Sequence, residues 1–102
     1  MTKEQFKTIT QWQDETFPDA TALSKVEHLR EEVEELAVDV ALDLNSKTME
    51  FADCFLLLYG AAAKAGMSYE DICNAIDEKM SINRKRKWGK PDKNGVVKHI
   101  EE

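Results

Sequence analysis

The amino-acid sequence predicts an all-α protein, a helical bundle of three to four main helices in one domain spanning residues 1–102. Apolar residues recur at helical spacing over most of the chain, and capping signals precede these segments. No segment shows the alternation of a half-buried strand. A chain of 102 residues is long enough to bury one modest core.

The first helix is expected from Lys3 to about Glu15, with Thr2 as its N-cap. Phe17 precedes Pro18, and a residue before proline disfavours the helical region of backbone conformation. The helix should therefore end before this pair.

The second and third helices follow from cap signals. Ser24–Glu27 has the S-x-x-E form of a capping box, which predicts a long helix from Ser24 to about Asp43. The third helix is expected over 47–65, after a turn at 45–46. Gly66 then stands where a helix C-terminus favours glycine.

The fourth helix is expected to start near Ser68–Asp71, a cap-like sequence, and to continue to about Lys87. The segment 88–102 is rich in turn residues and should form an irregular tail. Val96–Val97 is the one place in it where we expect a short extended piece.

The net charge and the number of cysteines limit which partners and which cellular compartment are expected. The formal net charge is −6, which argues against nucleic acid as the main partner. The N-terminal residues lack the apolar stretch of a signal peptide, and no run of 18 apolar residues predicts a membrane span. The two cysteines, Cys54 and Cys73, lack metal-ligand spacing, and we interpret them as small buried hydrophobic residues of a protein in a reducing cytosol. We expect a cytoplasmic protein without nucleic-acid or membrane partners.

Two acidic doublets, Glu32/Glu35 and Glu50/Asp53, carry the main functional signal. Each has i, i+3 spacing inside a predicted helix, which puts both carboxylates on one helical face. If the two helices pack antiparallel, four carboxylates converge. Because four such charges repel one another in a half-buried site, the arrangement predicts a divalent cation, Mg²⁺.

The second helix has other acids that plain solvation explains. Glu32 and Glu35 flank its apolar stripe, whereas Glu31 and Glu34 project further toward the opposite side. Val38 and Leu42 form a second apolar strip that one bundle core does not need. We interpret this strip as a subunit interface.

The third helix is apolar nearly all the way round, so it should be buried on most sides. Glu50 stands near its start, where solvation and the helix dipole suit an acid. Solvation suits Asp53 less well, because this acid lies deeper in the apolar segment.

Lys79, Asn83 and Arg86 share one face of the fourth helix at i, i+4 and i+7. Such side chains can bind phosphate oxygens that a metal leaves uncovered. Basic residues also suit a helix C-terminus, and the run 84–88 alternatively resembles an RNA-binding arm with one stacking aromatic. For His28 a hydrogen-bonding role competes with ligand binding, and for Trp12 core packing competes with base stacking.

With these residues in place, the chain resembles the MazG-like all-α nucleoside triphosphate pyrophosphohydrolases. The family pattern of E-x-x-E followed by E-x-x-D is matched at 32–35 and 50–53, and K-x-x-x-N-x-x-R at 79–86. The segments HLREEVEEL, EFADCFLLL and NRKRKWGKPDKNGVVKHI are similar to the short phage and bacterial branch with dATP/dGTP diphosphohydrolase domains. The resemblance covers about 10–101.

The resemblance implies a helical bundle that oligomerises as a homodimer or homotetramer. It implies attack of water on the α-phosphorus of a (d)NTP, giving a monophosphate and pyrophosphate, in nucleotide-pool control or house-cleaning. Mg²⁺, with Mn²⁺ as its substitute, would be the cofactor. The implied ligands are Glu32, Glu35, Glu50 and Asp53; the implied triphosphate contacts are Lys79, Asn83 and Arg86.

Further residues have looser assignments. Glu31, next to the first doublet, is the expected water-orienting base, although helix geometry points it away. Contacts to the base or sugar of the nucleotide are expected from Trp12 and His28, with Phe17 and Trp88 as alternatives, and no motif decides among the four.

Two other classes of protein fit the sequence less well. A non-enzymatic helical interaction module would keep the fold, but it would give no reason to bury the doublets. A carboxylate-bridged iron or manganese bundle uses Glu-x-x-His pairs, and no bundle helix has a histidine three residues after a glutamate.

Overall fold

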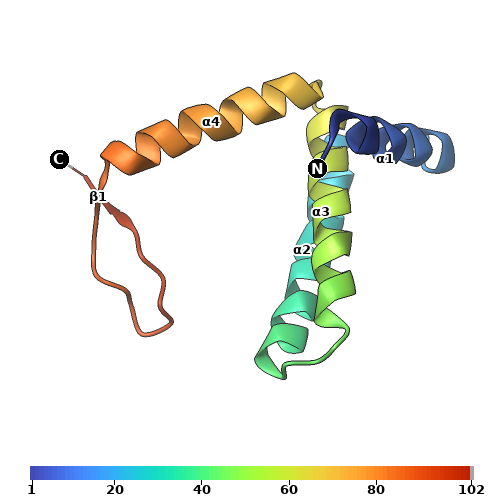
Figure 1. Cartoon of the computed structure of the whole chain (residues 1–102). Coiled ribbons are helices and arrows are strands. Elements are labelled where there is room, and N and C mark those ends of the chain that lie inside the picture. The colour runs from blue at the N-terminus through green and yellow to red at the C-terminus, as the bar shows by residue number, and fades with distance from the viewer. Residues whose placement is uncertain (102) are drawn as a thin grey trace. The chain divides into compact units, whose positions relative to one another are not determined.

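The computed structural model describes residues 1–101 and confirms the all-α prediction. In this range the chain forms four helices and one two-residue strand pair (Figure 1): α1 Lys3–Thr16, α2 Ala22–Ala41, α3 Lys47–Lys64, α4 Tyr69–Lys85, β1 Lys87–Trp88 and β2 His99–Ile100. The contacts divide the chain into a first unit, Met1–Glu70, and a second unit, Asp71–Glu102. None of the helices in the described range is long and apolar enough to cross a membrane.

The first helix begins as predicted. The Thr2 hydroxyl accepts a hydrogen bond from the backbone N–H of Gln5 at 3.0 Å, which satisfies one of the free donors of the first turn. Phe17 is the C-cap, and its N–H donates to the carbonyl of Gln13. The helix thus ends at Thr16, one residue beyond the expected end.

The predicted start of α2 is wrong by two residues. The N-cap is Thr21, with extended backbone, and its hydroxyl accepts from the N–H of Ser24 at 3.0 Å. The Ser24 hydroxyl accepts in turn from the N–H of Thr21 at 2.9 Å. Ser24 is therefore the N3 residue of a capping box, whereas the sequence pattern placed it at the N-cap.

Helices α2 and α3 both end in a left-handed residue. Asp43 has φ 51° and Gly66 has φ 97°. After each of them the next N–H reaches back five residues, from Leu44 to the carbonyl of Asp39 and from Met67 to that of Ala62. This pattern satisfies the last carbonyls of each helix, and it confirms the predicted stop at Gly66.

In the first unit α2 and α3 pack against each other as neighbours, and α1 packs on α3 (Figure 1). The ring of Phe6 on α1 meets Tyr59 edge-on, with centroids 6.3 Å apart. Gln13 of α1 donates through Nε2 to the carbonyl of Leu56 at 3.0 Å. Gly60 lies against Gln13, and a Cβ at this position would stand 3.0 Å from Gln13 Cδ. The glycine thus lets α1 approach α3 closely.

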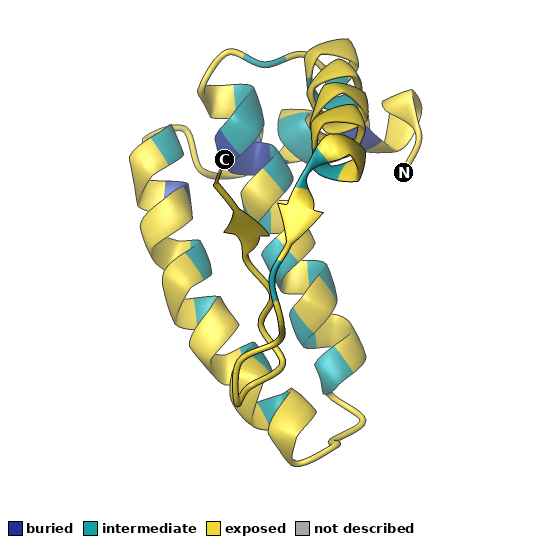
Figure 2. Cartoon of the chain, turned by 90° about the vertical axis from the view of Figure 1, so that its left-hand side faces the viewer, coloured by how far each residue is buried: buried dark blue, intermediate teal, exposed yellow. Residues whose placement is uncertain are grey.

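The buried residues are few, and Figure 2 shows them as short dark stretches in a mostly exposed ribbon. The prediction that α3 is buried on most sides is wrong for this chain, since Phe55 is 53% exposed and Phe51 and Leu58 are exposed as well. In the first unit α2 and α1 make the main contacts with α3, and part of its apolar circumference stays uncovered.

The fourth helix ends at Lys85, two residues earlier than expected, because Lys87 and Trp88 pair antiparallel with Ile100 and His99. The short extended piece predicted at Val96–Val97 lies instead at His99–Ile100.

A turn at the tip of the tail explains this shift. The Asp92 carboxylate accepts from the N–H groups of Asn94 and Val96, at 2.8 and 2.9 Å. These bonds hold Val96 in the turn and leave the strand to the residues that follow.

Candidate functional site

Three of the four predicted carboxylates meet between α2 and α3. One carboxylate oxygen each from Glu32, Glu35 and Glu50 lies within 4.8 Å of the other two. Glu32 and Glu35 come from the middle of α2, and Glu50 comes from the first turn of α3. The i, i+3 spacing in α2 therefore places its two acids as the sequence pattern predicted.

Glu50 is the most enclosed acid of this trio. Its Oε2 atom is buried without a hydrogen-bond partner among the described residues. Burial raises the pKa of Glu50 above its ordinary value, and a hydrogen bond with Glu32 and repulsion by that carboxylate add to the rise. A buried acceptor without a partner is costly, which makes this oxygen a fitting ligand for a cation.

Asp53 is exposed and lies outside the trio, so the expectation that it is more enclosed than Glu50 is wrong. Asp53 instead shares the lining of a pocket with Glu32. Its charge still reaches Glu35, where it contributes to the raised pKa.

The trio is electrostatically strained without a cation. Repulsion by Glu32 is the main reason why the pKa of Glu35 is raised, followed by a hydrogen bond with the same residue. Close carboxylates can share protons or bind a cation. Because all the candidate ligand atoms are carboxylate oxygens, the trio suits a hard divalent ion such as Mg²⁺ or Mn²⁺.

A pocket of about 280 Å³ opens beside the trio. Trp12 and Phe17 form an edge-on ring pair on its wall, with centroids 5.6 Å apart, and Trp12 is 57% exposed. Its lining residues come from α1, α2, α3 and the connection after α1: Trp12, Gln13, Phe17, His28, Glu32, Asp53, Leu56 and Leu57. The pocket therefore joins predicted metal ligands to aromatic side chains that can stack on a base.

His28 lines this pocket and makes a contact with the trio. Its Nε2 lies 3.3 Å from Oε1 of Glu32, one helical turn away on α2. His28 thus makes a polar contact with one carboxylate of the trio. Its position also leaves it beside a ligand in the pocket.

Two polar residues of the site were missed in the sequence. A second pocket of about 200 Å³ shares Gln13, Phe17, His28 and Leu57 with the first and ends at Lys25. Gln13 and Lys25 are each only 6% exposed, and Lys25 Nζ donates to Gln13 Oε1 at 3.3 Å. The sequence position of Lys25 could have identified it, because Lys25 falls on the same helical face as Glu32, seven residues earlier in the chain.

The remaining predicted residues lie elsewhere. Glu31 is exposed and outside the trio. In the second unit Lys79 is exposed, and the carbonyl of Asn83 accepts from the indole N–H of Trp88 at 3.0 Å.

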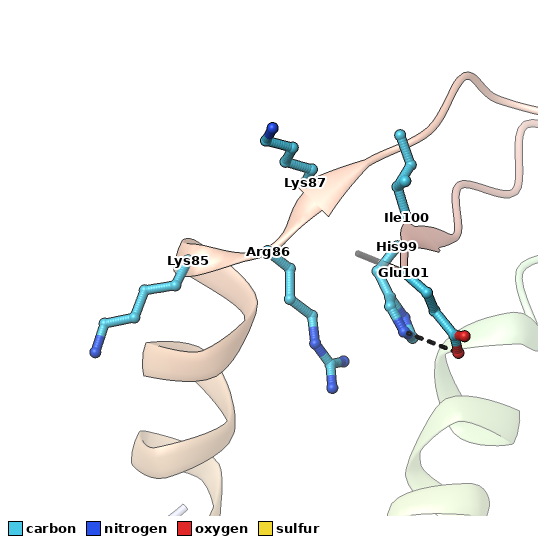
Figure 3. A pocket seen from close by; sticks show the side chains of 6 residues that line it. All are labelled: Lys85, Arg86, Lys87, His99, Ile100 and Glu101. Carbon is cyan, nitrogen blue, oxygen red and sulfur yellow. Dashed lines mark ion pairs between the residues drawn. The ribbon is translucent and has the colours of Figure 1, made fainter.

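Arg86 is half-buried and lines a pocket of about 410 Å³ with residues of the strand pair. Figure 3 shows its side chain on the same side as the His99 ring and the Glu101 carboxylate, which lie 4.0 Å apart. The side chains of Lys85 and Lys87 point in other directions. Of the three basic side chains drawn from this run, Arg86 is thus the one that points to the side of His99 and Glu101.

Comparison with known proteins places this chain in a family. A family model described as dATP/dGTP pyrophosphohydrolase matches residues 5–102. A dATP/dGTP diphosphohydrolase of Salmonella phage PMBT28 is 37% identical over 94 residues, which cover 92% of this chain and 30% of that protein. A dATP/dGTP diphosphohydrolase of cyanophage S-2L is 34% identical, covering 90% of this chain and 81% of that protein. The chain thus spans less than a third of the Salmonella phage relative and most of the cyanophage one.

A solved structure gives the same assignment. It is the cyanophage S-2L MazG-like pyrophosphohydrolase bound to dGDP and three catalytic Mn²⁺ ions per active site. The match has a TM-score of 0.81 and 30% identity, and it covers 100% of this chain and 96% of that chain. The motif resemblance and the helical fold agree with both comparisons, and the chain belongs to the dATP/dGTP pyrophosphohydrolase family.

Proposed function

We propose that this chain hydrolyses dATP or dGTP to the deoxynucleoside monophosphate and pyrophosphate, with Mg²⁺ or Mn²⁺ as cofactor. The observation that carries the proposal is the buried, unpartnered oxygen of Glu50 inside a carboxylate trio, next to a pocket with aromatic walls. The names of the phage relatives support a purine deoxynucleotide as substrate. Removal of such nucleotides would serve pool control or house-cleaning.

Glu32, Glu35 and Glu50 are the proposed metal ligands, and Asp53, on the rim beside Glu32, is the proposed fourth. A bound divalent ion would bridge phosphate oxygens and neutralise the charge that develops during hydrolysis. The raised pKa values of Glu35 and Glu50 support this role, because a cation would relieve the repulsion that causes them.

The other assignments rest on position and family resemblance. Trp12 and His28 line the pocket and are the proposed contacts to base and sugar. Glu31 is the proposed water-orienting base. Lys79, Asn83 and Arg86 are the proposed donors to triphosphate oxygens, which arginine binds well because it can donate two parallel hydrogen bonds.

We also propose a single MazG-like domain over 1–102 that assembles as a homodimer or homotetramer in the cytoplasm and takes no nucleic-acid partner. The exposed apolar strip that includes Val38 and Leu42 supports self-association. The net charge of −6 supports the absence of a nucleic-acid partner.

The test is pyrophosphate release from a panel of ribo- and deoxynucleoside triphosphates, with Mg²⁺ and with EDTA. Glu35→Gln should abolish release, whereas Glu34→Gln, an exposed neighbour outside the trio, should retain it. Metal-dependent release from dATP and dGTP would support the proposal. A folded protein that releases no pyrophosphate and binds no metal would instead favour a non-enzymatic interaction module.

A further inference from the structure

Lys25 is an unusual lysine, because its side chain is buried while its polar contacts are long ones. Its Nζ donates to Gln13 Oε1 at 3.3 Å and lies 6.0 Å from the centroid of the Phe17 ring. Burial lowers the pKa of Lys25, and repulsion by Lys64 lowers it further. A buried lysine normally has a close anionic partner.

No carboxylate within the described range forms an ion pair with Lys25. The charge of Asp14 favours the protonated form of Lys25, but Asp14 is itself ion-paired with Lys64 at 3.0 Å. An ammonium group has three N–H donors, and Gln13 accepts from one. Lys25 therefore presents spare donors to a pocket of about 200 Å³.

Gln13 holds this lysine in place. Its Nε2 donates to the carbonyl of Leu56 at 3.0 Å, which fixes the orientation of the amide and directs Oε1 toward Lys25. A side chain fixed from two sides keeps a precise direction for a ligand contact. Gln13 is thus a positioning residue for Lys25.

The position of Lys25 along α2 separates it from the phosphate end of the site. Lys25 and Glu32 lie on one face of α2, seven residues and about 10 Å of helix rise apart. Their two pockets share four lining residues and are therefore neighbours, with Glu32 and Trp12 in the wall of one and Lys25 in the wall of the other. A nucleotide with its phosphates at Glu32 would extend its base toward Lys25.

We propose that Lys25, positioned by Gln13, donates a hydrogen bond to N7 of a purine base and so selects purine over pyrimidine nucleotides. This inference rests on the proposed function, which supplies the orientation of the nucleotide. N7 is an acceptor common to adenine and guanine, and pyrimidines have no equivalent ring nitrogen on that edge. The Trp12–Phe17 pair supplies an aromatic surface for the same base.

The test compares dAMP with 7-deaza-dAMP, in which a C–H group replaces N7. Their binding is measured by calorimetry in the presence of Mg²⁺, for the full chain, Lys25→Met and the control Lys7→Met, an exposed lysine of α1. The unmodified chain and the control should bind dAMP about 10- to 100-fold more tightly than the analogue, as expected for one hydrogen bond from a charged donor. Lys25→Met should bind both ligands with the weaker affinity.

The inference is overturned if the unmodified chain binds both ligands equally, or binds neither, or if Lys25→Met keeps the preference for dAMP. The comparison of two ligands on the unmodified chain needs no variant, so equal binding there overturns the inference even if Lys25→Met fails to fold.

The proposed function fails separately. Hydrolysis of dATP and 7-deaza-dATP at equal kcat/KM would refute the role of Lys25 and leave the hydrolase intact. A preference for dAMP over its analogue that is lost in Lys25→Met, without hydrolysis of any triphosphate, would support the role of Lys25 and refute the hydrolase.

Discussion

At the scale of single residues, the site depends on which acid is enclosed. Glu50 combines a buried, unpartnered oxygen with two carboxylates from α2 within 4.8 Å. Without a cation this arrangement opposes folding, because charge repulsion and lost hydration act together. Residues that destabilise a fold in this way are typical of functional sites.

Glu50→Gln should separate stability from activity. The amide removes the enclosed charge, so the metal-free variant should unfold at a higher temperature than the unmodified chain. Metal-dependent pyrophosphate release should fall by about 100-fold or more, because a ligand is lost. Thermal unfolding in EDTA and a release assay with Mg²⁺ measure the two effects, with Glu34→Gln as control. A lower Tm with normal activity would contradict the assignment.

The pH dependence of the free energy of unfolding should show the same carboxylate repulsion in the metal-free protein. The pKa values of Glu35 and Glu50 are raised above 4.5, so between 4.5 and the raised values the folded chain binds more protons than the unfolded chain. The contribution of these groups to the free energy of unfolding must therefore fall as pH rises through this window. Urea unfolding in EDTA at several pH values measures the slope. Glu50→Gln should flatten it, and an unchanged slope would argue against the strain.

At the scale of elements, the contact of α1 with α3 builds the wall of the pockets. Gly60 allows Gln13 to lie close to α3, and Gln13 bonds to the carbonyl of Leu56 and to Lys25. One small residue in α3 thus determines where α1 carries Trp12 and Gln13.

Gly60→Ala tests this contact. Alanine would normally favour a helix, but its Cβ would overlap the Gln13 amide. The displaced amide should lower the free energy of unfolding by about 1–3 kcal/mol, measured by urea unfolding. In a Gln13→Ala background the same substitution should be nearly neutral or stabilising. Equal effects in the two backgrounds would show that the contact is unimportant.

The start of α2 gives a second prediction at this scale. Thr21→Ala removes the hydroxyl that accepts from the N–H of Ser24 and should lower the free energy of unfolding by about 1 kcal/mol. Thr8→Ala, at an exposed position inside α1, is the matched control and should change stability little. Urea unfolding of both variants makes the comparison, and equal losses would contradict the capping box.

At the scale of the whole molecule, exposed apolar side chains on α2 and α3 are the outstanding feature. Val38 is 55% exposed and Leu42 is 65% exposed, in agreement with the second apolar strip that the sequence indicates. Large apolar surfaces on a single chain usually mark an interaction site. They are the physical basis for the proposed homo-oligomer.

Introducing charge into this strip should dissociate the oligomer. Val38→Glu with Leu42→Glu should shift the mass measured by light scattering during size-exclusion chromatography to that of the monomer. Thr8→Glu with Gln11→Glu adds the same charge at exposed positions of α1 and should leave the assembly intact. A chain that is already monomeric at high concentration would contradict the proposal.

The sequence by itself determined the helical fold and the residues that make up the carboxylate trio. Period and capping depend on neighbours within one or two helical turns, so Thr2 and Gly66 were identified correctly. The i, i+3 spacing of Glu32 and Glu35 fixed their common face for the same reason. The start of α2 was misplaced because Thr21 and Ser24 both have cap-forming hydroxyls, and the pattern could not rank them.

Only the tertiary structure decided which polar groups are enclosed. Burial depends on what a second helix brings against a side chain, and no spacing within one helix contains that information. Packing of α2 on α3 enclosed Glu50 and left Asp53 at the rim, the reverse of the expectation. Packing of α1 on α3 joined Gln13 to Lys25, twelve residues apart in the sequence, and made them the floor of a pocket.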